Sequence, residues 1–389
     1  MDKIQLEDMN LLYDAFRESM KGSSWKSEPQ AFESDFLSEL TKLSNELSDR
    51  TYRTSKGSEF VLNERGKTRY IHGNRIRDRI VRHCFCDNIL SPTLMPYLIY
   101  NNGASQKGKG TDFARKQFEK DLHNFYLEHH SNNGYVAFID FSKFFDNIVH
   151  EKALNIISPL LNEQAKWLLG EVFDNFKIDV SYMTEEQYKD CINQKFNSIE
   201  YHKTISESDM TGEKFMNKSV DIGDQVSQDI GVFFPTRIDN YATVVRGCKR
   251  YGRYMDDIYI IHEDKAFLQS VIDGINEQAK ELGIFINDKK TRIVKLSACF
   301  KYLQFKYTLL ENGRVMKRIS SKTITRERRK LKAYKRLIDK GVMAYEDIEN
   351  CYKSWMGTYA RHMSKIQREN IQNLYMSLFE RRPRWKKLQ

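Results

Sequence analysis

Two aspartate-bearing segments carry the chemistry that this sequence could perform. In one, Asp256 and Asp257 follow Tyr254 and Met255 between two apolar runs, a pattern that predicts a strand, a turn and a second strand. Adjacent carboxylates repel each other and raise each other's pKa, and a bound divalent cation removes that cost. In the other segment, an apolar strand that starts at residue 135 ends in Asp140. Strands that deliver several carboxylates predict a metal-dependent nucleotidyl-transfer site.

Helices and short strands must position these carboxylates, and apolar periodicity predicts where they lie. Before Asp140 we expect two helices within 1–50, a hairpin at 59–72, a basic helix at 75–90 and a helix at 111–128. After Asp140 we expect helices up to residue 176, a helix at 229–246 that Pro235 starts or kinks, the hairpin around Asp256, a helix at 265–282 and a strand pair of 284–286 with 291–294.

The length of 389 residues is enough for two or three subdomains. We expect boundaries that give subdomains 1–125, 126–312 and 313–389, because the composition changes near Gly313. Residues 314–336 contain eleven Lys or Arg residues and one acidic residue, Glu327. Residues 185–220 are polar and weakly patterned, which predicts an insertion or a flexible loop.

Charge and composition narrow the classes of partner and of compartment. The chain has 63 Lys and Arg against 53 Asp and Glu, so its net charge of +10 suits a polyanionic partner. Its six cysteines are scattered and show no zinc-ligand spacing, as in a protein from a reducing compartment. The sequence shows neither a signal-like apolar core nor an apolar run of about 18 residues. We therefore expect a cytoplasmic protein with no membrane partner.

Taken together, these segments resemble a reverse transcriptase of the bacterial retroelement type from about residue 60 onward. The Tyr254-Met255-Asp256-Asp257 run resembles the family's YxDD motif, and Asp140 resembles its first palm motif. The resemblance implies an α+β right-hand polymerase with fingers, a palm of antiparallel sheet packed on helices, and a helical thumb. It also implies RNA-directed DNA synthesis with two magnesium ions, for which Mn²⁺ can substitute.

The resemblance assigns roles to the residues around the carboxylates. Asp140 and Asp256 would bridge both ions, Asp257 would support one of them, and the Phe141 carbonyl would add a ligand. Phe145 resembles the aromatic plate under the incoming sugar, which excludes a 2′-hydroxyl by steric contact. A core aromatic side chain is the alternative interpretation of Phe145.

The resemblance also implies contacts to template and nucleotide. The segment 222–228 is similar to a motif of diversity-generating retroelements, and it predicts that Gln228 lies near the templating base pair. Lys67 and Arg69 on the 59–72 hairpin would lie over the triphosphate, where fixed cations stabilise transition-state charge. Lys290 resembles the lysine that donates a proton to the leaving pyrophosphate. Lys67 and Arg69 have the alternative interpretation of solvated surface charges.

Two further segments complete the resemblance. Residues 302–305 resemble the primer-grip hairpin, with Gln304 in place of the usual glycine. The basic stretch 314–336 resembles the start of a thumb, where Lys and Arg side chains follow phosphates. Trp355 is interpreted as part of the thumb core and not as a stacking platform.

The resemblance implies the partners of the reaction but leaves the biological role open. They are an RNA template, with a cognate noncoding RNA as first choice, a DNA or RNA primer, deoxynucleoside triphosphates and a possible accessory protein. Diversity generation and antiviral defence both fit the sequence. Two alternatives stay open, namely an RNA-templated RNA polymerase and a non-catalytic RNA-binding scaffold with a polymerase fold.

Overall fold

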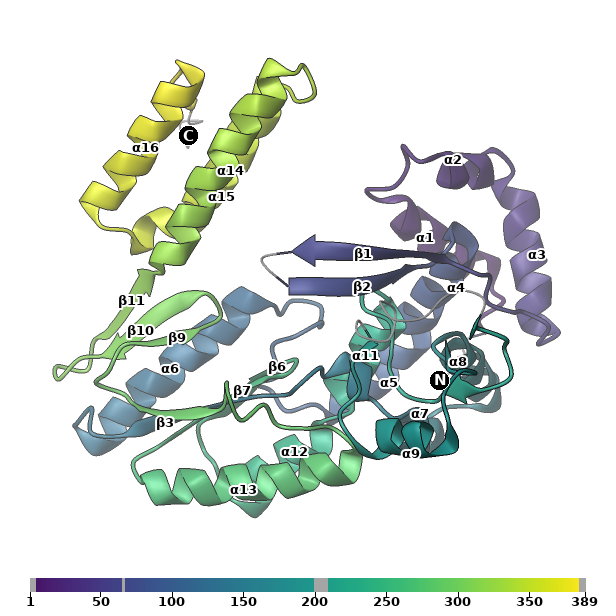
Figure 1. Cartoon of the computed structure of the whole chain (residues 1–389), viewed down its shortest axis with the longest axis horizontal. Coiled ribbons are helices and arrows are strands. Elements are labelled where there is room, and N and C mark those ends of the chain that lie inside the picture. Colours follow the sequence, from purple (N-terminus) through teal and green to yellow (C-terminus); the bar gives the residue numbers. More distant parts are fainter. Residues whose placement is uncertain (1–4, 65–66, 199–208, 385–389) are drawn as a thin grey trace. The chain divides into compact units, whose positions relative to one another are not determined.

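The structure is a computed structural model that describes residues 5–64, 67–198 and 209–384. The contacts within the chain define two compact units. Figure 1 shows the whole chain, coloured from the N-terminus to the C-terminus. The first unit comprises Met1–Ala114 and Ala137–Ile293, and the second comprises Arg115–Val136 and Val294–Gln389. The division into fingers, palm and thumb subdomains stays a prediction.

The N-terminal part of the first unit is helical, and it contains three helices where the sequence analysis expected two. These are α1 (Met9–Met20), α2 (Ser27–Ser34) and α3 (Phe36–Ser48). The additional helix α2 forms because Pro29 stands in its first turn, where a missing amide costs nothing, and because it buries Phe32. Asp8 caps α1 by accepting hydrogen bonds from the amides of Asn10 and Leu11.

The predicted 59–72 hairpin is confirmed. Strands β1 (Ser58–Glu64) and β2 (Lys67–Gly73) are antiparallel, and their register places Leu62 opposite Arg69. The predicted basic helix follows as α4 (Ile76–Phe85), which continues into a π-helical turn, Cys86–Leu90, and the short α5 (Ser91–Leu94). The predicted helix at 111–128 is present as α6 (Thr111–His129).

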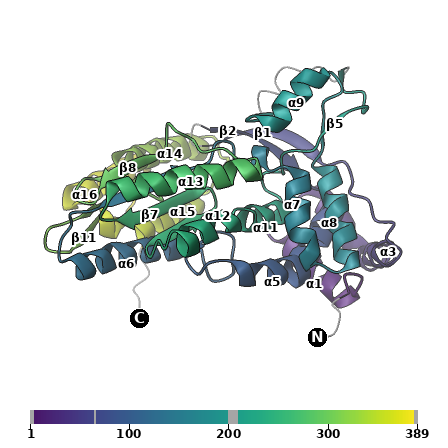
Figure 2. The same ribbon diagram turned by 90° about the horizontal axis from the view of Figure 1, so that it is seen from below.

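A four-stranded sheet with the order β6-β7-β3-β8 carries both aspartate segments. Its strands are β6 (Tyr251–Tyr254), β7 (Asp257–His262), β3 (Tyr135–Asp140) and β8 (Arg292–Lys295). The interior residues of β3 and β7 are buried, as their continuous apolar runs require. Helix α13 (Lys265–Leu282) runs beside β7 and covers the sheet, as Figure 2 shows.

The predicted pairing of 284–286 with 291–294 is wrong. Ile286 instead forms a β-bridge with Phe141, and β8 lies next to β3. The interior of β3 is buried, so the backbone N–H and C=O groups on both of its edges need hydrogen-bond partners. A local hairpin around Lys289 would leave one of these edges unpaired.

Helices α7 (His150–Ile157) and α8 (Glu163–Asn175) confirm the helical prediction up to residue 176. The helix predicted at 229–246 is wrong in its bounds. Helix α11 (Gln225–Phe233) begins four residues earlier, because the Asp224 carboxylate caps it by accepting from the Val226 amide. Pro235 then separates α11 from α12 (Thr236–Asn240) and a π-helical turn, Tyr241–Val245.

The described part of 185–220 contains regular structure, which the sequence analysis did not predict. Thr184 and Gln187 form a capping box at the start of α9 (Glu185–Asn193). Strand β4 (Ile178–Asp179) pairs with β5 (Phe215–Met216) beside a small apolar cluster. Residues 199–208 of this segment lie outside the described residues.

The second unit combines a sheet with a helical bundle. Strands β9 (Phe300–Tyr302), β10 (Phe305–Leu309) and β11 (Val315–Ile319) form an antiparallel sheet, and helices α14 (Ser321–Asp339), α15 (Tyr345–Tyr359) and α16 (Lys365–Phe379) follow. Leu331, Tyr352 and Tyr375 lie in the core of this bundle. Trp355 packs against that core, as predicted. Among the described residues, no helix is both long and apolar enough to cross a membrane.

Candidate active site

The tight turn between β6 and β7 presents the adjacent aspartates. Tyr254 pairs with Asp257, so only Met255 and Asp256 lie between the strands. Met255 adopts a left-handed conformation with φ +57°, and its side chain is buried. Asp256 is half-buried and Asp257 is exposed. Because Met255 anchors the turn from inside, the two carboxylates stand at its accessible surface.

Asp140 stands at the end of β3, which lies beside β7 in the sheet. Its carbonyl accepts a hydrogen bond of 2.7 Å from the Asn287 amide, and the Ser142 amide donates one of 2.7 Å to Phe285. Neither of these two bonds uses the Phe141 carbonyl, which lies between them. The sheet order and the two bonds therefore fix the backbone that carries Asp140 and Phe141.

Lys290 contacts the Asp140 carboxylate directly. Its ammonium lies 3.0 Å from Oδ1 and 2.7 Å from Oδ2 of Asp140. The Asp140 side chain is 14% exposed, whereas that of Lys290 is 51% exposed. The lysine is thus a half-exposed cation that balances the charge of a largely buried carboxylate.

The donor set suits a hard divalent cation, because carboxylate and carbonyl oxygens are the ligands that Mg²⁺ prefers. Within residues 5–64, 67–198 and 209–384, no group of three or more His, Cys, Asp or Glu side chains is close enough to hold a metal ion. In this structure the Lys290 ammonium forms an ion pair with the Asp140 carboxylate. A cation bound at Asp140 would compete with this ion pair.

Phe145 and Met255 meet at Gly231. Phe145 begins a short 3₁₀ turn, Phe145–Asn147, and packs edge-to-face on Phe144 with 5.5 Å between ring centroids. A Cβ atom on Gly231 of α11 would lie 3.1 Å from Phe145 Cζ and 3.2 Å from Met255 Sδ. The absence of a side chain at Gly231 therefore lets α11 approach both Phe145 and the β6–β7 turn.

Asn147 shapes the loop between Asp140 and Phe145. It is fully buried, and its Nδ2 donates to the carbonyls of Ser142 at 3.3 Å and Lys143 at 2.8 Å. Lys143 has φ +47°, a left-handed conformation that these bonds stabilise. Asn147 was not among the predicted residues, although an asparagine at the end of an aromatic run is a recognisable turn signal.

Gln228 lies in the second turn of α11, and its Oε1 accepts from Ser105 Oγ at 3.3 Å. It lines a cavity of about 700 Å³ together with Gln106, Lys107 and Gln225. The neighbouring Asp229 also lines this cavity, and burial raises the pKa of its carboxyl to about 6. Amides and a lysine around one cavity can donate to and accept from a polar planar ligand.

Lys67 and Arg69 both lie on β2 of the hairpin. Arg69 is half-buried, whereas the side chain of Lys67 lies outside the described residues. The base of the hairpin is tied to the segment that leads into α11, because His72 Nδ1 lies 2.6 Å from Asp221 Oδ2. That hydrogen bond raises the pKa of His72. Arg69 on β2 and Gln228 on α11 therefore lie on two elements that the His72–Asp221 hydrogen bond connects.

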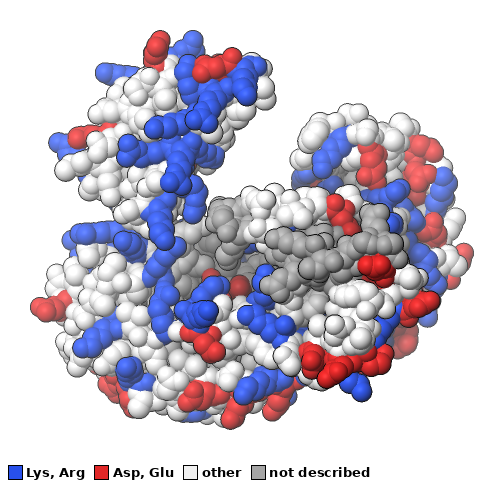
Figure 3. Space-filling view, in the orientation of Figure 1, with Lys and Arg blue, Asp and Glu red and all other residues white. Residues whose placement is uncertain are grey.

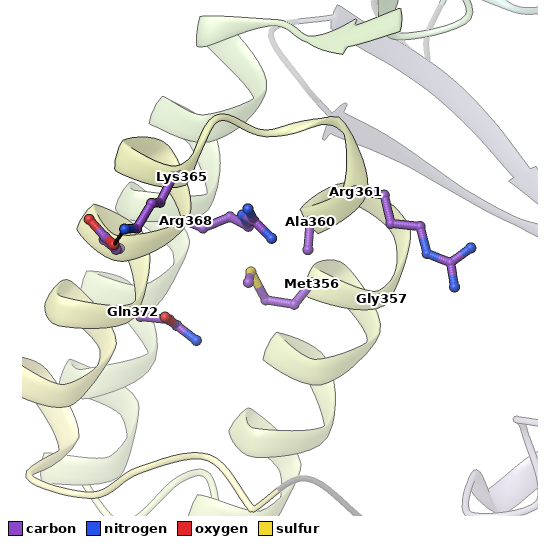
Figure 4. A pocket seen from close by; sticks show the side chains of 8 residues that line it. Met356, Gly357, Ala360, Arg361, Lys365, Arg368 and Gln372 are labelled. Atoms are coloured by element: carbon purple, nitrogen blue, oxygen red, sulfur yellow. Dashed lines mark ion pairs between the residues drawn. The ribbon is translucent and has the colours of Figure 1, made fainter. Parts of the chain in front are cut away.

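Basic side chains also gather on the second unit. Figure 3 shows Lys and Arg side chains in a band along α14, the helix that carries most of the basic stretch 314–336. Residues of α15, of the 3₁₀ turn Ala360–His362 and of α16 line a cavity of about 480 Å³, among them Arg361, Lys365 and Arg368 (Figure 4). In the β9–β10 hairpin, Gln304 has φ +76°, a backbone conformation that favours the glycine usual at this position.

The family model described as "Reverse transcriptase (RNA-dependent DNA polymerase)" matches residues 61–307, which include the β6–β7 turn and Asp140. This chain belongs to the reverse transcriptase family. The fold combines helices with antiparallel sheets, as reverse transcriptases do. The prediction of an α+β right-hand polymerase fold is therefore confirmed. No curated protein matches the sequence.

Among solved structures, this reverse transcriptase is similar to a telomerase from Candida albicans, in a complex with the TWJ fragment of telomeric RNA. The TM-score is 0.45 at 11% sequence identity, and the match covers 86% of this chain and 56% of that chain. The chain thus spans little more than half the length of the telomerase chain.

Proposed function

We propose that this reverse transcriptase copies an RNA template into DNA, with Asp140, Asp256 and Asp257 as its catalytic carboxylates. The observation that carries the proposal is that the family match includes both aspartate segments and that one sheet places their strands side by side. An RNA template, with a cognate noncoding RNA as first choice, a DNA or RNA primer and deoxynucleoside triphosphates would be its partners. An accessory protein is a further candidate partner.

Asp140 and Asp256 would hold two Mg²⁺ ions, with Asp257 and the Phe141 carbonyl as supporting groups, and Mn²⁺ could substitute. Bound there, such ions lower the pKa of the primer 3′-hydroxyl and neutralise charge on the leaving pyrophosphate. Lys290 lies at the Asp140 carboxylate, with which it forms an ion pair. Its ammonium would donate a proton to the leaving pyrophosphate.

The remaining residues would bind and select the nucleotide. Phe145 would form the floor under the sugar, held in place by Phe144 and by the close approach of Gly231. Gln228 would contact the nascent base pair from α11. Lys67 and Arg69 would contact the triphosphate from β2. We further propose a bacterial or phage retroelement or an antiviral defence system as the biological setting, which agrees with a cytoplasmic location.

The test is primer extension on an RNA template with the Asp256→Asn variant, which removes one charge and keeps the shape of the side chain. We expect loss of DNA synthesis by at least 1,000-fold, because metal catalysis and charge neutralisation together account for several kcal/mol of the barrier. Affinity for the primer–template, measured by fluorescence anisotropy, should be unchanged. Full activity of the variant would refute the catalytic assignment.

Asp273→Asn is the matched control. Asp273 is exposed on α13, away from both aspartate segments, so the same chemical change there should leave the rate unaltered. If both variants lose activity equally, the loss reflects the net charge of the protein and not the site.

A further inference from the structure

One arginine is entirely buried directly before the catalytic turn. Arg253 lies in β6, and both its side chain and that of Asp239 on α12 are 0% exposed. Arg253 Nε donates to Asp239 Oδ1 at 2.8 Å, and Nη2 donates to Oδ2 at 2.6 Å. The Tyr251 hydroxyl also donates to Asp239, at 2.6 Å. The carboxylate is therefore fully engaged in holding the guanidinium.

The remaining contacts of the guanidinium reach the backbone of the site. Nη1 donates to the Met255 carbonyl at 3.2 Å, and Nη2 donates to the Val232 carbonyl at 2.8 Å. Met255 is the left-handed residue of the turn, and Val232 follows Gly231 in α11. One rigid, planar group thus joins the catalytic turn to the helix that packs against Met255 and Phe145.

The backbone of Arg253 is fixed as well. Its amide donates to the Asn101 carbonyl at 3.1 Å, and its carbonyl accepts from the Gly103 amide at 3.0 Å. The backbone and the side chain of Arg253 are thus both bonded to their surroundings, and from this position Nη1 donates to the Met255 carbonyl.

A buried ion pair is weak evidence for stability, since an apolar pair of similar volume is often as stable. What an apolar pair cannot do is donate to a backbone carbonyl. A lysine cannot replace the arginine either, because a single ammonium cannot reach Asp239, Val232 and Met255 with the geometry of the guanidinium. The contacts to backbone carbonyls are therefore the feature that requires arginine here.

We propose that Arg253, held by Asp239, is a positioning residue that fixes the peptide between Met255 and Asp256 and thereby aims the Asp256 carboxylate at its cation. The inference rests on the proposed function, because it concerns the same carboxylate. The orientation of that peptide sets the direction of the Asp256 side chain. An error of about 1 Å in a catalytic group costs on the order of 100-fold in rate.

The test uses the full chain with an RNA template and a DNA primer, and it compares Arg253→Lys with the wild type. The first measurement is binding of Mn²⁺, followed by electron paramagnetic resonance, which needs no turnover. We expect affinity to fall about tenfold. In primer extension, kcat should fall by at least tenfold while KM for the deoxynucleotide stays within twofold.

Arg82→Lys is the matched control, because Arg82 and Asp224 form a second ion pair with side chains 2% and 0% exposed. The structure shows no contact of Arg82 with the turn among its described hydrogen bonds. We expect that variant to lose thermal stability but to bind Mn²⁺ as the wild type does. Equal Mn²⁺ affinity in Arg253→Lys and the wild type would overturn the proposal, and so would an equal loss in both variants.

If Arg253→Lys does not fold, as judged by circular dichroism, Tyr251→Phe decides the question. That variant removes only one hydrogen bond to Asp239, so we expect a fall of about threefold in Mn²⁺ affinity, and no fall would overturn the proposal. Asp256→Asn separates the two hypotheses. Full DNA synthesis by Asp256→Asn would refute the proposed function, whereas unchanged Mn²⁺ binding by Arg253→Lys would refute only the positioning role.

Discussion

A single methyl group at Gly231 should displace two side chains of the proposed site, those of Phe145 and Met255. In Gly231→Ala the new Cβ would lie 3.1 and 3.2 Å from two atoms of the Phe145 ring and 3.2 Å from Met255 Sδ. Favourable contacts between carbon atoms lie at about 3.5–4.0 Å, so the methyl group overlaps both side chains by several tenths of an ångström. Both neighbours must shift, and both belong to the proposed nucleotide site.

The energetic result is a difference between two effects. Replacing glycine by alanine inside a helix gains about 1 kcal/mol. Inserting a methyl group into a packed region costs about 1–3 kcal/mol. We therefore expect Gly231→Ala to change the free energy of unfolding by about 0 to −2 kcal/mol, measured by urea denaturation. The activity should change more, with kcat/KM for deoxynucleotides at least tenfold lower, because Phe145 and the Asp256 turn are displaced together.

Gly170→Ala is the control for this experiment. Gly170 lies inside α8, and a Cβ there would have no heavy atom within 4 Å. That variant should gain about 1 kcal/mol of stability and keep its activity. The double variant Gly231→Ala/Phe145→Ala should recover part of the lost stability, because the ring that the methyl group meets is gone. If Gly231→Ala matches Gly170→Ala in both stability and activity, the packing argument is wrong.

Three further predictions concern other described contacts. If Lys290 is the general acid, Lys290→Met should lower the single-turnover rate by about 100-fold, and an unchanged rate would refute the role. The variant should also reach its half-maximal rate at a lower Mg²⁺ concentration, because no ammonium competes for Asp140. Burial lowers the pKa of His150 from 6.5 to about 4, so stability is full above pH 6.5 and is lost as the pH falls toward 4. The difference between the two pKa values corresponds to about 3 kcal/mol in the free energy of unfolding. The variant His150→Gln should lose this pH dependence of the urea midpoint, whereas the wild type should keep it. Gln304→Gly relieves a left-handed backbone but loses the 2.8 Å bond from the Tyr359 hydroxyl, whereas Gln304→Ala loses the bond and keeps the strain. The glycine variant should therefore be more stable than the alanine variant by about 1–2 kcal/mol in thermal denaturation, and the reverse order would contradict the assignment.

Elements whose signals are local were predictable from the sequence. Apolar periodicity and turn residues within one short window predict four of them, namely the 58–73 hairpin, α6, α13 and the turn at Asp256. Where prediction failed, the deciding interaction was between distant residues or at a cap. Ile286 pairs with Phe141 instead of a near neighbour, and Asp224 starts α11 four residues before the predicted helix.

The candidate site divides in the same way. The sequence by itself determined which carboxylates are the candidates for metal chemistry, because adjacent aspartates in a turn and an aspartate at a strand end are local patterns. Only the tertiary structure showed that Lys290 contacts Asp140, that Gly231 lies against Phe145 and Met255, and that Arg253 binds the Met255 carbonyl. These contacts join residues up to 150 positions apart. Packing and hydrogen-bond direction decide them, and neither is encoded in the spacing of residues along the chain.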